Sequence, residues 1–277
     1  MRSDRVDKRI GFIGVGNMGS AIIQGLIESN MTNEKQIYGF DYNSTILKEK
    51  ALQFGFNIGK DNKNIIEQSD IVFLAIKPQV ITEVLSEISD FAKPGQIFIS
   101  MAAGISIEFI KYFFNFDPKI IRIMPNTPAL IGEGMTGMAT KSPVSYEETL
   151  FIKKLLSSFS IVEEVEENLL DAVTAISGSS PAYVDLFIES LADGGVLLGL
   201  PRDKSYIFAT QAVIGAAKMI LETGKHPGIL KDMVCSPAGT TIAAVHQLEK
   251  HGFRNAIIEA MIAAEKRSKE MNNLFEK

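Results

Sequence analysis

Two patterns of hydrophobic residues divide the chain at about residue 166. Up to that point, short runs that are apolar almost throughout alternate with amphipathic stretches of helical period. Such runs are typical of strands covered on both faces, as in a parallel sheet. The predicted strands are Ile10–Ile13, Gln36–Phe40, Ile71–Ala75, Gln96–Ser100, Ile120–Met124, Gly137–Ala139 and Ile161–Glu164. The predicted helices are Asn17–Ser29, Thr45–Phe54, Gln79–Ile88, Ser106–Tyr112 and Glu147–Ser158. We therefore predict an α/β domain with a mostly parallel sheet over residues 1–166.

Strand-like runs disappear after Glu166, and long segments of helical period continue to the C-terminus. The predicted helices are Asn168–Ala175, Pro181–Leu198, Arg202–Glu222, Thr241–His251 and Phe253–Asn272. We expect Ser180 to cap the second of these helices at its N-terminus, with Pro181 in its first turn. The pattern predicts a second, all-α domain over residues 167–277.

One predicted helix of this second half is apolar on almost every face. Between Phe208 and Leu221, only Thr210, Gln211 and Lys218 are polar. A helix of this kind must be buried all round. It is either the central helix of a monomeric bundle or an interface shared between two subunits, and a small helical domain favours the interface.

A glycine-rich turn follows the first predicted strand and leads directly into a helix. Its sequence, Gly14-Val15-Gly16-Asn17-Met18-Gly19, has the spacing Gly-x-Gly-x-x-Gly of a Rossmann dinucleotide-binding turn. Gly14 permits the tight turn, Gly16 lets a pyrophosphate approach the backbone, and Gly19 lets helix and strand pack closely. The N–H groups at the helix start favour an anion. We expect contacts to a dinucleotide from Gly14, Gly16, Asn17, Met18 and Gly19.

Asp41 ends the second predicted strand, where a carboxylate accepts hydrogen bonds from a ribose 2'-hydroxyl. By itself Asp41 favours NAD(H). The polar residues Tyr42, Asn43 and Ser44 follow it and suit a 2'-phosphate if the carboxylate turns away, so NADP(H) and NAD(H) both stay open. A structural alternative is that Asp41 caps the helix that starts near Thr45.

Three further loops follow predicted strands at their C-terminal ends, where open α/β sheets bind ligands. The first is Ala75–Pro78, the second is Met101–Gly104 with its small residues, and the third is the proline-containing Met124–Pro128, a plausible wall of the nicotinamide site. The cofactor contacts predicted in these loops are Ala75, Ile76, Lys77, Pro78, Ala102, Ala103 and Asn126.

In the helical half, the segment Ser236–Ile242 joins a loop to a helix start. Free N–H groups at Gly239, Thr240 and Thr241 are suited to hold a carboxylate, and the Thr241 hydroxyl is suited to reach the atom being reduced. We therefore expect substrate to bind at Ser236, Gly239, Thr240 and Thr241.

Composition and charge narrow the function to small-molecule chemistry. The 277 residues are 46% hydrophobic and 22% charged, as in a globular protein. A formal net charge of −5 argues against a nucleic-acid surface. The single cysteine, Cys235, excludes an intrachain disulfide and a multi-thiolate metal site, and it favours a reducing cytoplasm. Residues 1–9 are mostly charged, unlike a signal peptide, and no apolar stretch reaches the roughly 18 residues of a membrane helix. We expect no metal, nucleic-acid or membrane partner.

The helical half contains no clear proton donor for a ketone or an alcohol. His226, His246 and His251 are better explained as structural or solvated residues, and Tyr183 as core packing. A protonated iminium needs no strong acid, because hydride transfer to it requires mainly orientation and a polar partner for nitrogen.

From about Arg9 to Met271 the chain resembles the pyrroline-5-carboxylate reductase family. The segments that carry the resemblance are Gly14–Gly19, Ala75–Pro78, Met124–Pro128, Ser177–Ser179, Pro227–Leu230 and Ser236–Thr241 followed by Leu248-Glu249. The resemblance implies an N-terminal domain that binds NAD(P)H and a helical domain that interlocks with a second subunit, in a homodimer or a larger homo-oligomer. It places the active site between one subunit's cofactor domain and the dimer's helices.

The resemblance also implies roles for single residues. Thr241 corresponds to the threonine that hydrogen-bonds the substrate's ring nitrogen, and Gly239 and Thr240 to the loop that holds its carboxylate. Asn62 corresponds to the contact with the adenosine ribose or its phosphate. The chain departs from the family pattern at Ala238, where glycine is frequent, and a positive φ there would strain alanine.

The resemblance implies reduction of 1-pyrroline-5-carboxylate to L-proline, with NAD(P)H delivering hydride to the C=N bond. One alternative is a β-hydroxyacid dehydrogenase, which would need a lysine in the helix after Ser177–Ser179, and Pro181–Gly195 contains none. The other is a dinucleotide-sensing module without enzymatic activity.

Overall fold

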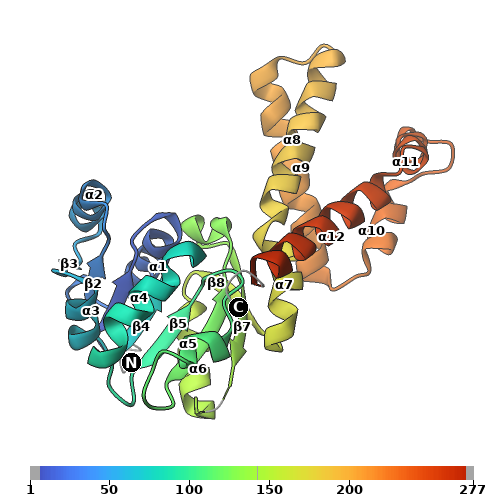
Figure 1. The fold of residues 1–277 in the computed structure, drawn as a ribbon. Helices are drawn as coiled ribbons and strands as arrows, with labels where there is room; N and C mark the ends of the chain where they lie inside the picture. The colour runs from blue at the N-terminus through green and yellow to red at the C-terminus, as the bar shows by residue number, and fades with distance from the viewer. Residues whose placement is uncertain (1–6, 142, 273–277) are drawn as a thin grey trace. The chain divides into compact units, whose positions relative to one another are not determined.

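The computed structural model describes residues 7–141 and 143–272, which form two compact units. The first unit comprises the described residues up to Ser179 and those from Ala264 onward, and the second comprises Ser180–Ala263. Figure 1 colours the chain from the N-terminus in blue to the C-terminus in red. The boundary between the compact units lies after Ser179. A cofactor-binding domain over residues 1–166 and a helical substrate-binding and dimerisation domain over residues 167–277 stay predictions.

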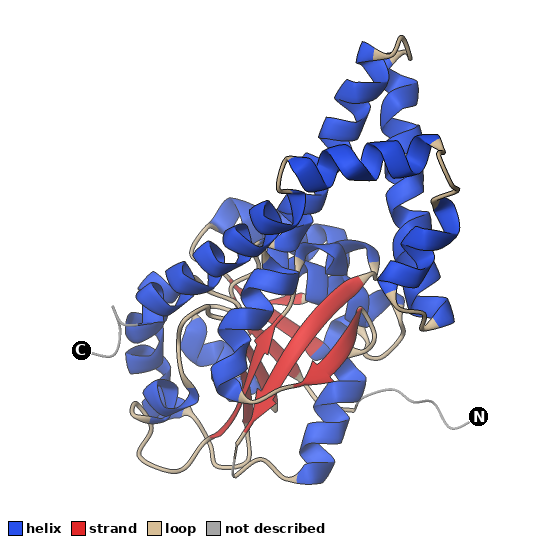
Figure 2. Cartoon of the chain, turned by 90° about the vertical axis from the view of Figure 1, so that its right-hand side faces the viewer, coloured by secondary structure: helices blue, strands red, loops and turns tan. Residues whose placement is uncertain are grey.

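An eight-stranded sheet forms the centre of the first unit, in the order β3-β2-β1-β4-β5-β6-β7-β8. All neighbouring strands pair in parallel except β6 and β7, which are antiparallel, so the predicted Rossmann-type α/β fold is confirmed. Figure 2 shows helices in blue flanking these strands in red. The strands are β1 (Ile10–Ile13), β2 (Ile37–Phe40), β3 (Asn57–Ile58), β4 (Ile71–Leu74), β5 (Ile97–Ser100), β6 (Lys119–Met124), β7 (Gly134–Thr140) and β8 (Ser160–Glu164).

Seven α-helices of the first unit connect or cover the strands within the described ranges. They are α1 (Asn17–Glu28), α2 (Ser44–Phe54), α3 (Asn62–Gln68), α4 (Ile81–Ile88), α5 (Ile107–Lys111), α6 (Tyr146–Leu156) and α7 (Leu170–Val173). The apolar strand residues separate into two buried clusters, because successive side chains of a strand point to opposite faces. In one cluster the rings of Phe12 and Phe73, on neighbouring strands, stack with centroids 4.7 Å apart.

Several predicted boundaries differ from the observed ones. Strand β7 is longer than predicted. The prediction missed its ends because residues 134–140 are rich in Gly, Thr and Met and alternate only weakly between apolar and polar side chains. The two-residue strand β3 was missed since it is exposed and too short to have a pattern. Helix α4 starts later than predicted because Pro78–Val80 forms a separate 3-10 turn.

The second unit consists of helices only, as predicted. They are α8 (Ser180–Leu197), α9 (Arg202–Thr223), α10 (Pro227–Val234), α11 (Thr240–Lys250) and the part of α12 (Phe253–Asn272) up to Ala263. Helices α8 and α9 lie side by side (Figure 1), and an ion pair of 2.5 Å between Asp193 and Arg202 ties them near the turn. Helix α10 was not predicted separately; His226 caps it by accepting the Gly228 N–H at 3.0 Å.

The segment Phe208–Leu221 lies in α9 and is largely exposed within this chain. Ile207, Phe208 and Leu221 expose 68%, 64% and 73% of their surface. The buried residues of this helix are Ser205 and Ala209. The interpretation of α9 as the central helix of a monomeric bundle is therefore wrong for the chain by itself, and the subunit interface stays a prediction.

The chain between α7 and α8 is wound more widely than an α-helix. Thr174–Gly178 forms a π-helical turn, and α8 starts directly after Ser179. Ser180 is thus the first residue of α8 rather than its cap, a difference of one position from the prediction. None of the helices within the described ranges is long and apolar enough to cross a membrane.

Candidate functional site

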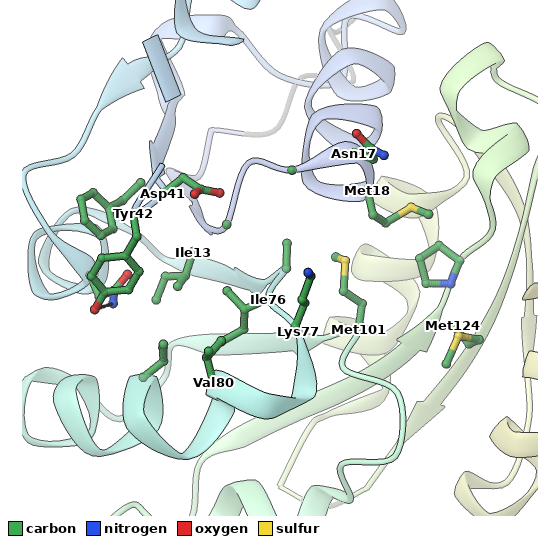
Figure 3. A pocket seen from close by; sticks show the side chains of 17 residues that line it. Ile13, Asn17, Met18, Asp41, Tyr42, Ile76, Lys77, Val80, Met101 and Met124 are labelled. Carbon is green, nitrogen blue, oxygen red and sulfur yellow. Dashed lines mark hydrogen bonds between the residues drawn. The ribbon is translucent and has the colours of Figure 1, made fainter. Parts of the chain in front are cut away.

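A cavity of about 570 Å³ opens at the carboxyl ends of β1 and β4 in the first unit. The strand order reverses between these two strands, and ligands bind at such a point in open α/β sheets. Figure 3 shows Asp41 and Tyr42 at one end of the cavity and Met124 at the other. The lining residues are Ile13, Gly14, Gly16, Asn17, Met18, Phe40, Asp41, Tyr42, Asn62, Ala75, Ile76, Lys77, Val80, Val84, Met101, Met124 and Pro125.

The three glycines of the turn meet three different steric demands. Gly14 has φ +94°, and a Cβ there would lie 2.4 Å from the Ala75 carbonyl oxygen. At Gly19 a Cβ would lie 2.5 Å from the Gly14 carbonyl oxygen, so this glycine lets α1 pack against the turn. At Gly16 a Cβ would meet nothing within 4 Å. The space in front of Gly16 is therefore open for a ligand to approach the backbone.

Helix α1 points its N-terminus at this space. Its N-cap is Gly16, which offers no side-chain hydrogen bond, so the first-turn N–H groups lack a side-chain acceptor. Unpaired N–H groups and the positive end of the helix dipole favour an anion at this position. The arrangement suits a pyrophosphate.

Asp41, which directly follows β2, forms a hydrogen bond with the glycine turn. Its Oδ2 accepts the Val15 N–H at 3.0 Å, and its Oδ1 accepts the Asn43 N–H at 2.9 Å. The cap of α2 is Asn43, whose Oδ1 accepts from Thr45 and Ile46, so the alternative of Asp41 as the helix cap is wrong. Asp41 remains a lining residue of the cavity.

Three polar side chains form a cluster beside Asp41. The Asn62 Nδ2 donates to Glu87 Oε2 at 2.7 Å and to the Tyr42 hydroxyl at 3.3 Å, and that hydroxyl lies 3.2 Å from Glu87 Oε2. Asn62 is 1% exposed, and its Oδ1 accepts no hydrogen bond from the described residues. Partial burial and then the Glu87 carboxylate raise the pKa of Tyr42, which keeps the phenol protonated.

Some of the predicted cofactor contacts do not line the cavity. Pro78 starts a 3-10 turn, and Ala102 and Ala103 pack against hydrophobic clusters. Both polar atoms of the Asn126 side chain form hydrogen bonds with the backbone. Its Nδ2 donates to the Ser177 carbonyl at 3.1 Å, and its Oδ1 accepts the Met135 N–H at 2.8 Å. The contacts of these residues with a cofactor stay predictions.

The sequence did not predict several residues that line the cavity. Val80 ends the 3-10 turn before α4, Val84 lies in the first turn of α4, and Phe40 ends β2. Val84 and Glu87 are three positions apart in α4, so they share one face of the helix. Glu87 belongs to no sequence motif. Its position one helical turn after Val84 is the feature of the sequence that could have indicated it.

In the second unit, α11 begins where the sequence predicted a helix start. Its N-cap, Gly239, offers no side-chain hydrogen bond, so the first-turn N–H groups at Thr240 and Thr241 have no side-chain acceptor. The Gly239 N–H itself donates to the Ser236 carbonyl at 3.0 Å and is not free. Ala238 has φ +57°, so the expected backbone strain is present.

Within the described ranges, no group of three or more His, Cys, Asp or Glu side chains is arranged to hold a metal ion.

Family models match both parts of the chain. The model for pyrroline-5-carboxylate reductase dimerisation matches residues 167–271, and the model for coenzyme F420-dependent NADP oxidoreductase matches residues 9–104. Both matches agree with the observed order of an α/β unit followed by helices.

Relatives with 39–45% identity over nearly the whole chain are pyrroline-5-carboxylate reductases. The pyrroline-5-carboxylate reductase of Escherichia coli (strain K12) is 45% identical over 96% of this chain and 99% of its own, and that of Arabidopsis thaliana is 39% identical over 95% of each. The Plasmodium falciparum pyrroline carboxylate reductase, solved with NADP bound, superposes with a TM-score of 0.86 at 31% identity over 97% of this chain and 99% of its own. The Coxiella burnetii enzyme gives 0.89 at 32% identity over 96% and 99%. The chain belongs to the pyrroline-5-carboxylate reductase family.

Proposed function

We propose that this chain reduces 1-pyrroline-5-carboxylate to L-proline with a nicotinamide dinucleotide as the reductant. The observation that carries the proposal is the cavity around Gly14–Gly19 in a chain that matches pyrroline-5-carboxylate reductases over their whole length. The bound dinucleotide would supply a hydride to C5 of the C=N bond. The ring nitrogen takes up one proton, or arrives protonated, so that charge and atoms balance.

The residues of the cavity fit a dinucleotide in three places. The open backbone at Gly16 and the start of α1 suit the pyrophosphate. The end of the cavity with Asp41 and Tyr42, to which Asn62 donates a hydrogen bond, suits the adenosine ribose, and the end with Met124 suits the nicotinamide. The chain's own contribution is to orient the nicotinamide and to exclude water from it.

We propose that the start of α11 holds the substrate. The N–H groups of Thr240 and Thr241 would receive the carboxylate, and the Thr241 hydroxyl would bond the ring nitrogen. Both residues are accessible, since Thr240 is exposed and Thr241 is half-buried. An imine needs orientation more than a strong acid, which agrees with a threonine in this role.

We propose a homo-oligomer built on dimers, located in the cytoplasm. Large apolar side chains of α9, among them Ile207, Phe208 and Leu221, are exposed in the single chain, which supports a partner subunit on this helix. The single cysteine supports a reducing compartment.

The experiment is the loss of NADH or NADPH absorbance when the purified protein meets 1-pyrroline-5-carboxylate, with a 2-keto acid and a simple cyclic imine as controls. We expect rapid loss with pyrroline carboxylate and the formation of proline in equal amount. Loss with the 2-keto acid alone would favour a hydroxyacid dehydrogenase. Dinucleotide binding without turnover of any substrate would favour a sensing module.

A pair of variants tests the role of Thr241. Thr241→Val removes the hydroxyl at nearly constant shape and should lower kcat about 100-fold, in the range of a lost positioning or proton-transfer group. Thr241→Ser keeps the hydroxyl and should retain most of the activity. Equal rates for both variants would remove the hydroxyl from the mechanism.

A further inference from the structure

We propose that Asn126 is a positioning residue of the reduction, because it holds one wall of the cavity against the π-helical turn that precedes α8. The inference rests on the proposed function, in which the nicotinamide binds at the end of the cavity with Met124. Asn126 directly follows the lining residues Met124 and Pro125 but is not itself a lining residue. It acts through the backbone that it bonds and does not touch the dinucleotide.

The two backbone partners of Asn126 fix the orientation of its amide. The Met135 N–H donates and therefore faces Oδ1, at 2.8 Å, whereas the Ser177 carbonyl accepts and therefore faces Nδ2, at 3.1 Å. Asn126 is 8% exposed. An asparagine at this position could cap the 3-10 turn Thr127–Ile131, yet its side chain makes no capping bond. The amide joins its own loop to β7 and to the π-helical turn Thr174–Gly178 instead.

The sequence explains why the Ser177 carbonyl takes a donor from outside its helix. In an α-helix this carbonyl would accept the N–H of the residue four positions later, which is Pro181 and has none. The chain widens just before this point, where the Ser179 N–H donates to the Thr174 carbonyl, five positions earlier, at 2.8 Å. The Asn126 amide supplies the donor that Pro181 lacks.

The π-helical turn and the helix before it pack against the wall of the cavity. Met124 lines the cavity and forms a buried cluster with Ala139 and Leu170, against which Val173 packs. A Cβ placed at Gly178 would lie 3.9 Å from the Met124 Sδ, so the π-helical turn lies directly beside this side chain. Because packed side chains transmit displacements, a shift of the turn moves the wall at Met124.

Hydride transfer is more sensitive to such a shift than dinucleotide binding is. A misplacement of about 1 Å between reacting groups costs up to about 100-fold in rate. The adenosine half of the dinucleotide is proposed to bind at the other end of the cavity, where Figure 3 shows Asp41 and Tyr42. Loss of the Asn126 bond should therefore lower kcat and leave the affinity for ADP-ribose, which lacks the nicotinamide, unchanged.

Asn126→Asp is the test variant, because it keeps the shape of the side chain. Its carboxylate still accepts the Met135 N–H but cannot donate to the Ser177 carbonyl. We expect kcat for the reduction of 1-pyrroline-5-carboxylate to fall between about 10-fold and 100-fold, and titration calorimetry to give the wild-type dissociation constant for ADP-ribose. The uncharged Asn126→Ser is too short to reach both partners and should show the same division, which keeps the test valid if Asn126→Asp fails to fold.

A second substitution tests the path through Ser177. Pro181→Ala restores an N–H four positions after Ser177, so the carbonyl regains a donor within its own helix. We expect Asn126→Asp to cost severalfold less in kcat in the Pro181→Ala background than in the wild-type background, as coupled residues do in a double-mutant cycle.

Asn33→Asp is the matched control. The Asn33 Oδ1 accepts the Lys35 N–H at 2.8 Å and caps a 3-10 turn, a role that an aspartate fills equally well. This variant should keep the wild-type kcat and the wild-type affinity for ADP-ribose.

An Asn126→Asp variant with the wild-type kcat, or one that loses ADP-ribose affinity as strongly as kcat, would overturn the positioning role. An equal cost of Asn126→Asp in both backgrounds would overturn the path through Ser177 and favour a direct contact of Asn126 with the dinucleotide. Absence of turnover by the wild-type protein would instead overturn the proposed function, on which the inference rests.

Discussion

The two compact units of this chain use their apolar residues in opposite ways. In the first unit, strands such as β1 and β4 are buried at every position, and two clusters fill both faces of the sheet. In the second unit, the long helices α8 and α9 bury Ala192, Ser205 and Ala209, while large side chains stay exposed. The first unit completes its core within one chain, and the second leaves large apolar side chains exposed.

The difference predicts which property of the protein each unit controls. An open sheet with a glycine turn at its first strand forms a cavity that residues of the first unit line. The helical unit offers a helix start at Thr240 and an apolar face on α9, both accessible in the single chain. Perturbing the first unit should therefore change stability, and perturbing the second should change assembly.

The largest effect is expected at Gly14 in the first unit. Gly14→Ala places a Cβ 2.4 Å from the Ala75 carbonyl oxygen at φ +94°, so we expect the free energy of unfolding to fall by about 4 kcal/mol or more. Gly16→Ala is the control, since its Cβ meets nothing. It should fold normally but bind a dinucleotide more weakly. Urea unfolding measures the change in stability, and dinucleotide titration measures the change in binding. An equal loss of stability in both variants would contradict the different steric roles of Gly14 and Gly16.

The next effect is expected at Glu167, which joins β6, α5 and Lys141 just after β7. This carboxylate is 12% exposed in its side chain and bonds Arg122 at 2.9 Å, Lys141 at 2.8 Å and the Ile107 N–H at 2.7 Å. Glu167→Gln leaves Arg122 buried without its counter-charge and should cost about 3 kcal/mol at pH 7. The exposed Glu147→Gln is the control and should cost almost nothing.

The cost of Glu167→Gln should depend on pH. Burial acts to raise the pKa of Glu167, but the bonds from Arg122, Lys141 and Ile107 outweigh it and lower the pKa below 4.5. A lowered folded-state pKa gives stability that is present above the unfolded value and is lost as pH falls through the folded one. The wild-type advantage over the variant should shrink below about pH 4.5 in unfolding measurements. A constant difference between pH 7 and pH 3 would count against this network.

A third effect is expected at Phe208 in the second unit. Phe208→Asp places a charge on the exposed apolar face of α9 and should weaken subunit association about 30-fold or more, as loss of a central interface residue does. Analytical ultracentrifugation measures it. Leu52→Asp is the control, because Leu52 is 90% exposed on α2 of the first unit, and it should leave the oligomeric state unchanged. An unchanged assembly in Phe208→Asp would locate the interface elsewhere.

The smallest effect is expected at Ala238. Ala238→Gly relieves a φ of +57° and should stabilise the protein by about 0.5 kcal/mol after the extra chain entropy of glycine is subtracted. Ala243→Gly within α11 should destabilise by about 1 kcal/mol. Replacing alanine by glycine should thus stabilise the protein at Ala238 and destabilise it at Ala243. Thermal unfolding of both variants at one protein concentration measures the two changes. Destabilisation by both would show that the loop does not hold the strained φ.

The sequence predicted the elements whose pattern is local. The strand Ile10–Ile13 and the helix starting at Asn17 agree with the structure because an apolar run, three glycines and a helix start lie next to each other in the chain. The same reasoning missed β3, which is too short to show alternation, and α10, which is separated from α9 by a short turn at Gly224. Asn126 was predicted as a cofactor contact from its loop, yet its side chain bonds the backbone of β7 and the π-helical turn.

The sequence by itself determined the α/β order, the glycine turn with its steric roles, and the helix start at Thr240. These depend on residue type, period and neighbours along the chain. Only the tertiary structure decided that Glu87 meets Asn62 and Tyr42, that Asp41 bonds Val15 rather than capping a helix, and that Glu167 joins three elements. The physical reason is that a side chain's pattern predicts whether it is buried, whereas its partners depend on which elements the sheet order brings together.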